Sequence, residues 1–479
     1  MTATNPPVRA FPDGFVWGSA TSSYQIEGSV DVDGRSPSIW DVFSHTPGRV
    51  VGGDTGDVAV EHYQRYRDDV ALMSELGLRG YRFSIAWSRV LPGGTGAVNE
   101  AGLDFYSRLV DELLAHNVDP LVTLYHWDLP QVLEEKGGWL NRDVAGYFAE
   151  YAAAVAGRLG DRVTTFTTHN EPWCAAYLGY ATGVHAPGHT NNAESLAVAH
   201  HLNLAHGEAV GALRDTLPAT GQVSITLNLQ NVRPVSDSAA DVAAAAHVER
   251  LSNDIFLDPI LRGHYPEELI RETSHITDWS FVHDGDLEQI SRPIDILGVN
   301  YYSPALVAAP TDDLRTRAAA GGEWINDPQS GDRPSLWPGT DLAYALPQEG
   351  PYTAMGWRVE ADSLRELLER VHADYPGIPL IVTENGAAYD DQVGSDGVVH
   401  DDDRIAYFDG HIGAILDAVT AGVPVTGYFA WSLLDNFEWA WGYSKRFGIV
   451  HVDFDTQQRT PKDSAHWYSK VIAANGLSS

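Results

Sequence analysis

Short apolar runs alternate with longer amphipathic stretches along most of the chain. The runs are rich in β-branched and aromatic residues, which is typical of buried strands in a parallel sheet. Eight runs are predicted to be strands: Phe15–Ala20, Tyr81–Ile85, Pro120–Tyr125, Val163–Thr168, Gln222–Asn228, Asp295–Asn300, Pro379–Thr383 and Gly427–Trp431. The main predicted helices are Tyr63–Leu76, Ala101–His116, Val144–Leu159, Ala193–Leu213, Asp362–Tyr375 and Asp403–Ala421.

This alternation predicts an α/β protein with a parallel sheet. Eight strands are the number that closes a (β/α)8 TIM barrel, and such barrels run from about 200 to more than 400 residues as one unit. No linker or internal repeat divides the chain, so we expect residues 1–479 to form a single barrel domain. Thr311–Gly350 lacks periodicity and is rich in Gly, Pro and Asp, and we interpret it as an extended loop over the mouth of the barrel.

Polar residues follow or end the predicted strands, and the carboxyl ends of barrel strands meet at one face. We therefore expect the following residues to converge there: Gln25, Arg82, His126, Asn170, Glu171, Asn300, Tyr302, Glu384, Trp431 and Glu438.

Two carboxylates in this set stand where apolar runs stop. Glu384 follows the run Ile378–Val382 and precedes Asn385-Gly386, while Glu171 ends a β-branched and aromatic run just before Pro172. Either one alone could be a salt-bridged surface group. Together, two carboxylates at strand ends are what retaining glycosidic hydrolysis needs, one as nucleophile and one as acid and then base.

The net charge of −34 argues against nucleic acid and anionic membranes as partners, because both would repel the chain. Cys174 is the only cysteine, so no intrachain disulfide can form. Met1–Ala10 contains no apolar core, and no stretch approaches the ~18 apolar residues of a membrane span. We expect a cytoplasmic protein.

Several other features have plainer interpretations. His200, His201 and His206 lack a metal-binding pattern, and no Gly-rich phosphate loop appears, so we expect neither a metal nor a cofactor. Cys174 lacks the partners of a cysteine nucleophile and is interpreted as a packing residue. Asp390–Asp403 is acidic and is interpreted as a solvated turn, with an adventitious calcium site as the alternative.

Three motifs carry a resemblance to a known family. Phe15–Gly28 (FVWGSATSSYQIEG), Thr168–Pro172 (THNEP) and Val382–Gly386 (VTENG) are similar to the opening, acid/base and nucleophile segments of retaining β-glucosidases of glycoside hydrolase family 1. The likeness runs from about Phe11 to Ile472. His169 departs from the family's pattern, which more often has Phe at this position.

The resemblance implies a role for each motif residue. Glu171 would be the general acid/base and Glu384 the nucleophile, with Arg82 and Tyr302 supporting the ionised nucleophile. The residues that would bind substrate are Gln25, His126, Asn170, Asn300, Tyr302, Trp357, Trp431, Glu438 and Trp439. Polar members of this set suit a polyol, and the tryptophans would supply apolar platforms. For His126, an ordinary strand-end histidine is the rival interpretation.

The implied substrate is a terminal β-glucoside or a short β-linked oligosaccharide, with galactosides and fucosides as further substrates. Three alternatives stay open: a transglycosylase, a 6-phospho-β-glycosidase, and a carbohydrate-binding protein without catalysis. Glu438 bears on the second alternative, because we expect it to be ionised and to repel a 6-phosphate. It could instead pair with Lys445. A homo-oligomer is also an open alternative.

Overall fold

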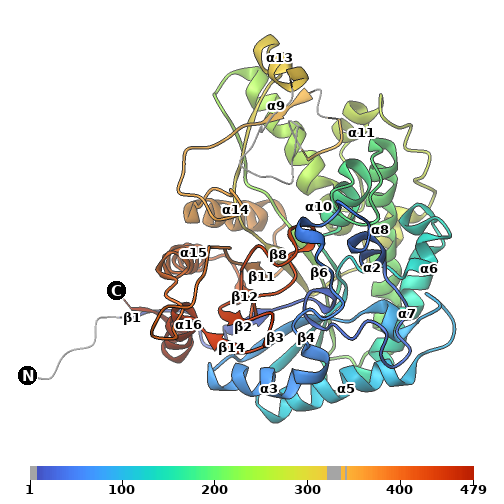
Figure 1. The fold of residues 1–479 in the computed structure, drawn as a ribbon. Coiled ribbons are helices and arrows are strands. Elements are labelled where there is room, and N and C mark those ends of the chain that lie inside the picture. The colour runs from blue at the N-terminus through green and yellow to red at the C-terminus, as the bar shows by residue number, and fades with distance from the viewer. Residues whose placement is uncertain (1–7, 321–335, 340–341, 479) are drawn as a thin grey trace, which may run out of the picture.

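The computed structural model describes residues 8–320, 336–339 and 342–478. Its centre is a closed barrel of eight parallel strands, in the order β11-β12-β2-β3-β4-β5-β6-β8 (Figure 1). The strands are β2 (Val16–Ala20), β3 (Gly80–Ser84), β4 (Asp119–Tyr125), β5 (Thr165–Asn170), β6 (Gln222–Asn228), β8 (Ile296–Asn300), β11 (Leu380–Asn385) and β12 (Val425–Trp431). The chain therefore folds as a (β/α)8 TIM barrel, as its hydrophobic pattern predicted.

Each of the eight predicted strands is confirmed, with ends that differ by at most two residues. Differences of two residues occur at both ends of β5, at the amino end of β12 and at the carboxyl end of β11. β5 continues through His169 and Asn170, and β11 continues through Glu384 and Asn385, because these polar residues are buried and paired to neighbouring strands. For example, Asn170 lies opposite Thr226 of β6.

Helices surround the barrel (Figure 1). The six predicted ones are confirmed as α3 (His62–Glu75), α5 (Glu100–Ala115), α7 (Val144–Leu159), α8 (Asn192–Thr216), α14 (Ala361–Asp374) and α15 (Asp402–Thr420). The structure adds α9 (Ala239–Glu249), α10 (Ile255–Leu261), α11 (Glu267–Thr273), α12 (Asp286–Ile290), α16 (Asp463–Ala474) and a π-helical segment, η3 (Cys174–Thr182).

The segment interpreted as one long loop, Thr311–Gly350, contains regular structure, so that interpretation is wrong in part. It holds the helix α13 (Asp312–Ala320) and the short strand β10 (Tyr344–Ala345). The helix begins with two aspartates and has no apolar stripe, so its sequence does not show the hydrophobic periodicity by which a helix is recognised. Residues 321–335 and 340–341 lie outside the described residues. β10 joins β9 (Ala305–Ala308) and β7 (Val232–Pro234) in a small sheet after the carboxyl ends of β6 and β8.

The acidic segment Asp390–Asp403 is only partly the solvated turn that we expected. Asp391 and Asp401 are buried, and both form ion pairs with the buried Arg404. Asp391 also pairs with Lys462 at 2.5 Å. The lysine comes from a distant part of the chain, so the local sequence could not indicate that these carboxylates are buried.

The two ends of the described chain lie side by side. β1 (Val8–Ala10) pairs antiparallel with β15 (Gly476–Ser478), and Val8 lies opposite Ser478. This ribbon lies near the amino end of β2, because the Trp17 indole donates to Asn475 Oδ1 at 2.9 Å. It is therefore on the side of the barrel away from the carboxyl ends of the strands. Among the described residues, no helix combines the length and apolar character needed to cross a bilayer.

Candidate active site

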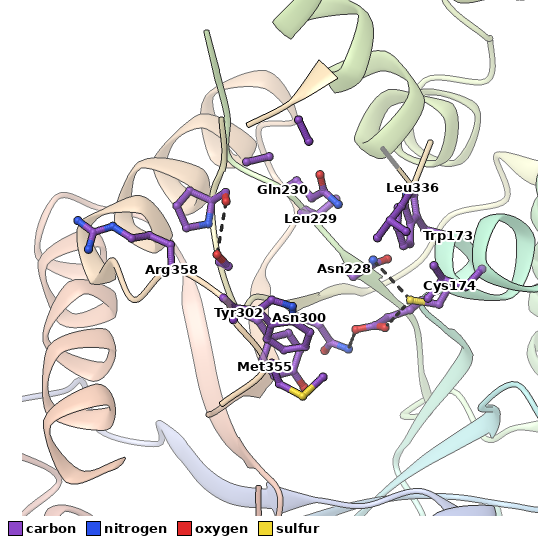
Figure 2. Close-up of a pocket in the computed structure, with 18 of the residues that line it drawn as sticks. Trp173, Cys174, Asn228, Leu229, Gln230, Asn300, Tyr302, Leu336, Met355 and Arg358 are labelled. Carbon is purple, nitrogen blue, oxygen red and sulfur yellow. Dashed lines mark hydrogen bonds between the residues drawn. The ribbon is translucent and has the colours of Figure 1, made fainter. Parts of the chain in front are cut away.

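A cavity of about 270 Å³ opens at the carboxyl ends of the barrel strands. Figure 2 shows side chains from several strand ends and loops that face it. Nine of the twelve predicted site residues line the cavity: His126, Glu171, Asn300, Tyr302, Trp357, Glu384, Trp431, Glu438 and Trp439. The other three, Gln25, Arg82 and Asn170, are buried. Arg82 hydrogen-bonds to Glu384 and Asn170, and Gln25 bonds to the backbone carbonyl of Phe437, next to Glu438.

Glu384 lies within β11 and is almost completely buried. Arg82 Nη1 donates to its Oε1 at 2.5 Å, and the Tyr302 hydroxyl donates to its Oε2 at 2.7 Å. Both carboxylate oxygens are therefore held by protein donors, one of them a cation. This environment favours the ionised form of Glu384.

Glu171 directly follows β5 and has a left-handed backbone conformation, with φ at +47°. Its own N–H donates to the carbonyl of Thr226 at 2.9 Å, which ties this conformation to β6. Asn300 Nδ2 donates to Glu171 Oε1 at 2.7 Å, and Cys174 Sγ donates to Oε2 at 3.1 Å. The hydrogen-bond donors to this carboxyl are neutral, unlike the cation that contacts Glu384.

The two carboxyl groups affect each other's ionisation. Burial raises the pKa of Glu384 above its ordinary value, while Arg82 and the Tyr302 hydroxyl limit this rise. Burial, followed by the negative charge of Glu384, raises the pKa of Glu171 to about 8. Near neutral pH the pair therefore holds one proton, and the geometry places that proton on Glu171.

Asn170 connects the residues around Glu384 with those around Glu171. Its Oδ1 accepts from Arg82 at 2.6 Å and from Asn300 at 3.1 Å, so its Nδ2 must be the atom that donates to His126 Nε2 at 3.0 Å. His126 then carries its proton on Nδ1, which makes no hydrogen bond within the described part of the chain. Burial and the nearby charge of Arg82 lower the pKa of His126, so the ring is neutral.

Gln25 is not among the residues that line the cavity, although its side chain interacts with the carboxyl group of Glu438, which does line it. Its amide nitrogen donates to Asn436 Oδ1 at 3.0 Å and to the carbonyl of Phe437 at 2.8 Å, and Ser22 donates to its oxygen at 2.6 Å. The structure thus shows Gln25 holding the segment that leads to Glu438.

Glu438 differs from our expectation in its charge. Burial and the charges of Glu384 and Glu171 raise its pKa to about 8, so it is protonated near neutral pH in the free protein. Its Oε2 makes no hydrogen bond among the described residues. Lys445, the partner we considered for it, donates to the carbonyl of Ala354 at 2.6 Å.

Aromatic rings form two walls of the cavity. Trp431 and Trp439 stack near the His126 ring, with centroids 5.8 and 5.9 Å from it. Trp357 lies against Tyr302 with a centroid distance of 5.2 Å. The tryptophans therefore provide apolar surfaces next to His126 and next to Tyr302 in the cavity lining.

Sequence reasoning missed other cavity residues, including Trp127, Trp173, Asn228, Leu229, Gln230 and Met355. Asn228 is the last residue of β6, so the rule for strand ends could have found it. Most of the others lie on loops or on η3, where no periodic signal exists. Cys174 also lines the cavity, so it is more than the packing residue that we expected.

The histidines of α8 are held by hydrogen bonds. His200 bonds to the Tyr265 hydroxyl at 3.0 Å and to Asp286 at 2.9 Å, and His206 bonds to Thr168 at 2.7 Å. Within residues 8–320, 336–339 and 342–478, no group of three or more His, Cys, Asp or Glu side chains is arranged to hold a metal ion.

Comparison with known proteins agrees with this geometry. The model of glycosyl hydrolase family 1 matches residues 8–477. The chain belongs to glycosyl hydrolase family 1. Family 1 is a family of retaining glycosidases, so the chain is a glycoside hydrolase by descent.

Several relatives of this family 1 member are similar over almost their whole length. A bifunctional β-D-glucosidase/β-D-fucosidase from Bifidobacterium breve is 50% identical over 471 residues, which are 97% of this chain and 98% of that protein. The crystal structure of a psychrophilic β-glucosidase from Micrococcus antarcticus has a TM-score of 0.92 and 48% identity, and covers 98% of each chain. A β-glucosidase from Thermotoga maritima in complex with isofagomine lactam has a TM-score of 0.90 and 44% identity, covering 98% of this chain and 100% of that one.

Proposed function

We propose that this protein hydrolyses terminal, non-reducing β-D-glucosidic bonds with net retention. Glu384 attacks the anomeric carbon while Glu171 protonates the departing oxygen, so the glycosidic bond breaks and a glycosyl ester forms. Glu171, now a carboxylate, then removes a proton from water, and that water displaces Glu384 from the sugar.

The observation that best supports this division of roles is the unequal partnering of the two buried carboxyl groups. A nucleophile must be ionised, and Glu384 contacts Arg82 directly. A general acid must hold a proton near neutral pH, and Glu171 has a pKa of about 8. Once Glu384 is esterified its charge is gone, so the pKa of Glu171 falls and the same group can act as a base.

The polar end of the cavity suits a glucosyl unit. The protonated Glu438 carboxyl offers both a donor and an acceptor to vicinal hydroxyls, and His126 Nδ1 offers a further donor. Trp431 and Trp439 can pack against the C–H face of the ring. Because one relative is named for both glucosidase and fucosidase activity, we include fucosides as a second substrate.

A 6-phosphoglucoside is the alternative substrate that the cavity disfavours. Three of its lining residues are the carboxyl groups Glu171, Glu384 and Glu438, and Arg358 is the one Lys or Arg side chain among the lining residues described. The ionised Glu384 would repel a phosphate dianion in this poorly solvated site, and the protonated Glu171 and Glu438 carry no positive charge that could offset the repulsion.

Kinetics with 4-nitrophenyl β-D-glucoside and its 6-phosphate test the proposal. We expect turnover of the glucoside and a kcat/KM at least about 10²-fold lower for the phosphate, from two or more lost or repulsive contacts. Comparable values for both would contradict our assignment of the sugar. Failure to turn over any aryl β-glycoside would favour a binding protein instead, and analysis of products at high substrate concentration would reveal transglycosylation.

We further propose that one catalytic barrel, residues 1–479, carries the whole activity without a cofactor, and that it acts in the cytoplasm. The continuous strand order of the barrel and the single, buried cysteine support this proposal.

A further inference from the structure

Cys174, the only cysteine of the chain, lies against the carboxyl group of Glu171. Its Sγ donates to Glu171 Oε2 at 3.1 Å, and Asn228 Nδ2 donates to the same sulfur at 3.8 Å. Figure 2 shows Asn228 and Cys174 joined in this way on one wall of the cavity. The thiol is therefore part of a hydrogen-bonded chain that ends on the carboxyl group.

The backbone places the thiol there. Cys174 N–H donates to the carbonyl of Glu171 at 2.9 Å, and this bond closes the turn from which η3 begins. The turn returns the side chain three positions later to the carboxyl group of Glu171. π-Helical turns occur frequently at functional sites.

Toward the ionised form of this carboxyl group, the thiol can act only as a donor. Burial, followed by the negative charge of Glu171, raises the pKa of Cys174 well above its ordinary value, so the thiol stays protonated. Glu171 Oε1 already accepts from Asn300, whose orientation is set because Thr383 Oγ1 donates to its Oδ1 at 2.8 Å. Oε2, the oxygen that contacts Cys174, is therefore the one left to carry the exchangeable proton.

We propose that Cys174 is a positioning residue for the acid/base carboxyl, which orients Glu171 Oε2 and favours its ionised form. This inference rests on the role that the proposed function gives to Glu171. A hydrogen bond to a charged oxygen is stronger than one to a neutral oxygen, so the thiol helps most when Glu171 must act as a base. Because S–H is a weak donor, the proton can still return to Oε2 for the next turnover.

The other charges around Glu171 stay in place when Cys174 is changed. The charge of Glu384 raises the pKa of Glu171 and the charge of Arg82 lowers it. Glu438 and Tyr302 also lie close enough to interact electrostatically with Glu171. A change in the titration of Glu171 in a Cys174 variant therefore reports on the thiol.

The test is the pH dependence of kcat/KM for 4-nitrophenyl β-D-glucoside in Cys174→Ala and Cys174→Ser. Alanine removes the donor, so the alkaline limb should move up by roughly half a pH unit, and serine supplies a stronger donor, so it should move down by a similar amount. Thr182→Ala is the matched control, because it removes a buried hydroxyl that bonds to the Leu178 carbonyl on the same π-helical segment. Its alkaline limb should coincide with that of the unmodified protein.

Opposite shifts for alanine and serine would support the proposal. Shifts in the same direction, or limbs that coincide with the unmodified protein, would overturn it. Thermal unfolding shows whether Cys174→Ala folds. If it does not, the serine variant alone tests the proposal, because only a downward shift of its alkaline limb agrees with the proposal. A bell-shaped profile that no variant moves refutes this inference alone, whereas an unmodified protein that turns over no aryl β-glycoside refutes the proposed function.

Discussion

The surroundings of Glu384 and of Glu171 differ in both charge and backbone. Glu384 belongs to the extended strand β11 and contacts a guanidinium and a phenol. Glu171 follows its strand in a left-handed conformation, and its donors are an amide and a thiol. One site stabilises an anion on a residue within a strand, and the other holds a proton on a residue in a left-handed conformation. The same side chain can thus be given two chemical roles by the elements that carry it.

The largest effects should follow removal of either carboxyl group. Glu384→Gly should lose nearly all hydrolysis, and added azide should yield an α-glycosyl azide, because it enters from the face that Glu384 leaves vacant. Glu171→Ala should lose about 10²- to 10⁴-fold on poor leaving groups, with azide giving the β-anomer. NMR of the azide products distinguishes these outcomes. If both variants gave the same anomer, the two roles would be assigned wrongly.

Arg82 tests whether charge is what distinguishes the two carboxyl groups. Arg82→Met should raise the pKa of Glu384, move the acidic limb of kcat/KM upward and lower kcat/KM by roughly 10²-fold, since a buried carboxylate loses its cation. Arg82→Lys keeps the charge and is the matched control, with a smaller shift of the limb. An acidic limb that stays in place in Arg82→Met would show that Glu384 does not determine it.

A smaller effect concerns the proton on Glu171. Because its pKa is raised to about 8, the acid form is present below that pH and is lost above it, so activity should fall on the alkaline side through about pH 8. Glu171→Gln cannot ionise, so this limb should disappear when turnover is followed with 2,4-dinitrophenyl β-D-glucoside. An unchanged limb in this variant would assign it to another group.

The smallest effect should appear in stability. Glycine relieves a left-handed conformation but weakens a strand, so Glu171→Gly should be more stable than Glu171→Ala by about 1 kcal/mol. At Glu384 the order should reverse, with glycine less stable than alanine by about 0.5–1 kcal/mol. Urea unfolding of the four variants measures both differences. The same sign at both positions would contradict the contrast in backbone strain.

Most of the barrel could be predicted from the sequence because its strands are buried on both sides and read as continuous apolar runs. Gln222–Asn228 was predicted to the residue, since polar positions bound it on both sides. The helix α13 was missed, because a short exposed helix needs no apolar stripe. The buried pairing of Asp391 with Lys462 was missed as well, because both partners look like surface residues in their own segments.

Many of the cavity residues could be predicted from the sequence, but their protonation states and hydrogen-bond partners could not. Residue types and motif positions indicated Glu171, Glu384 and Glu438, and all three line the cavity. The protonation of Glu438 depends on two neighbouring carboxyl groups that only the fold brings near. The roles of Gln25 and Cys174 depend on where their hydrogen bonds go, and sequence spacing does not contain that information.

The ribbon formed by β1 and β15 has a practical consequence for handling the protein. Val8 and Ser478 are direct partners on the side of the barrel away from the cavity. Attachment to a solid support through either terminus would therefore leave the mouth of the cavity facing the solution. A short peptide joining these two partners would also make the polypeptide circular, so that it could be opened at a surface loop elsewhere without cutting any barrel strand.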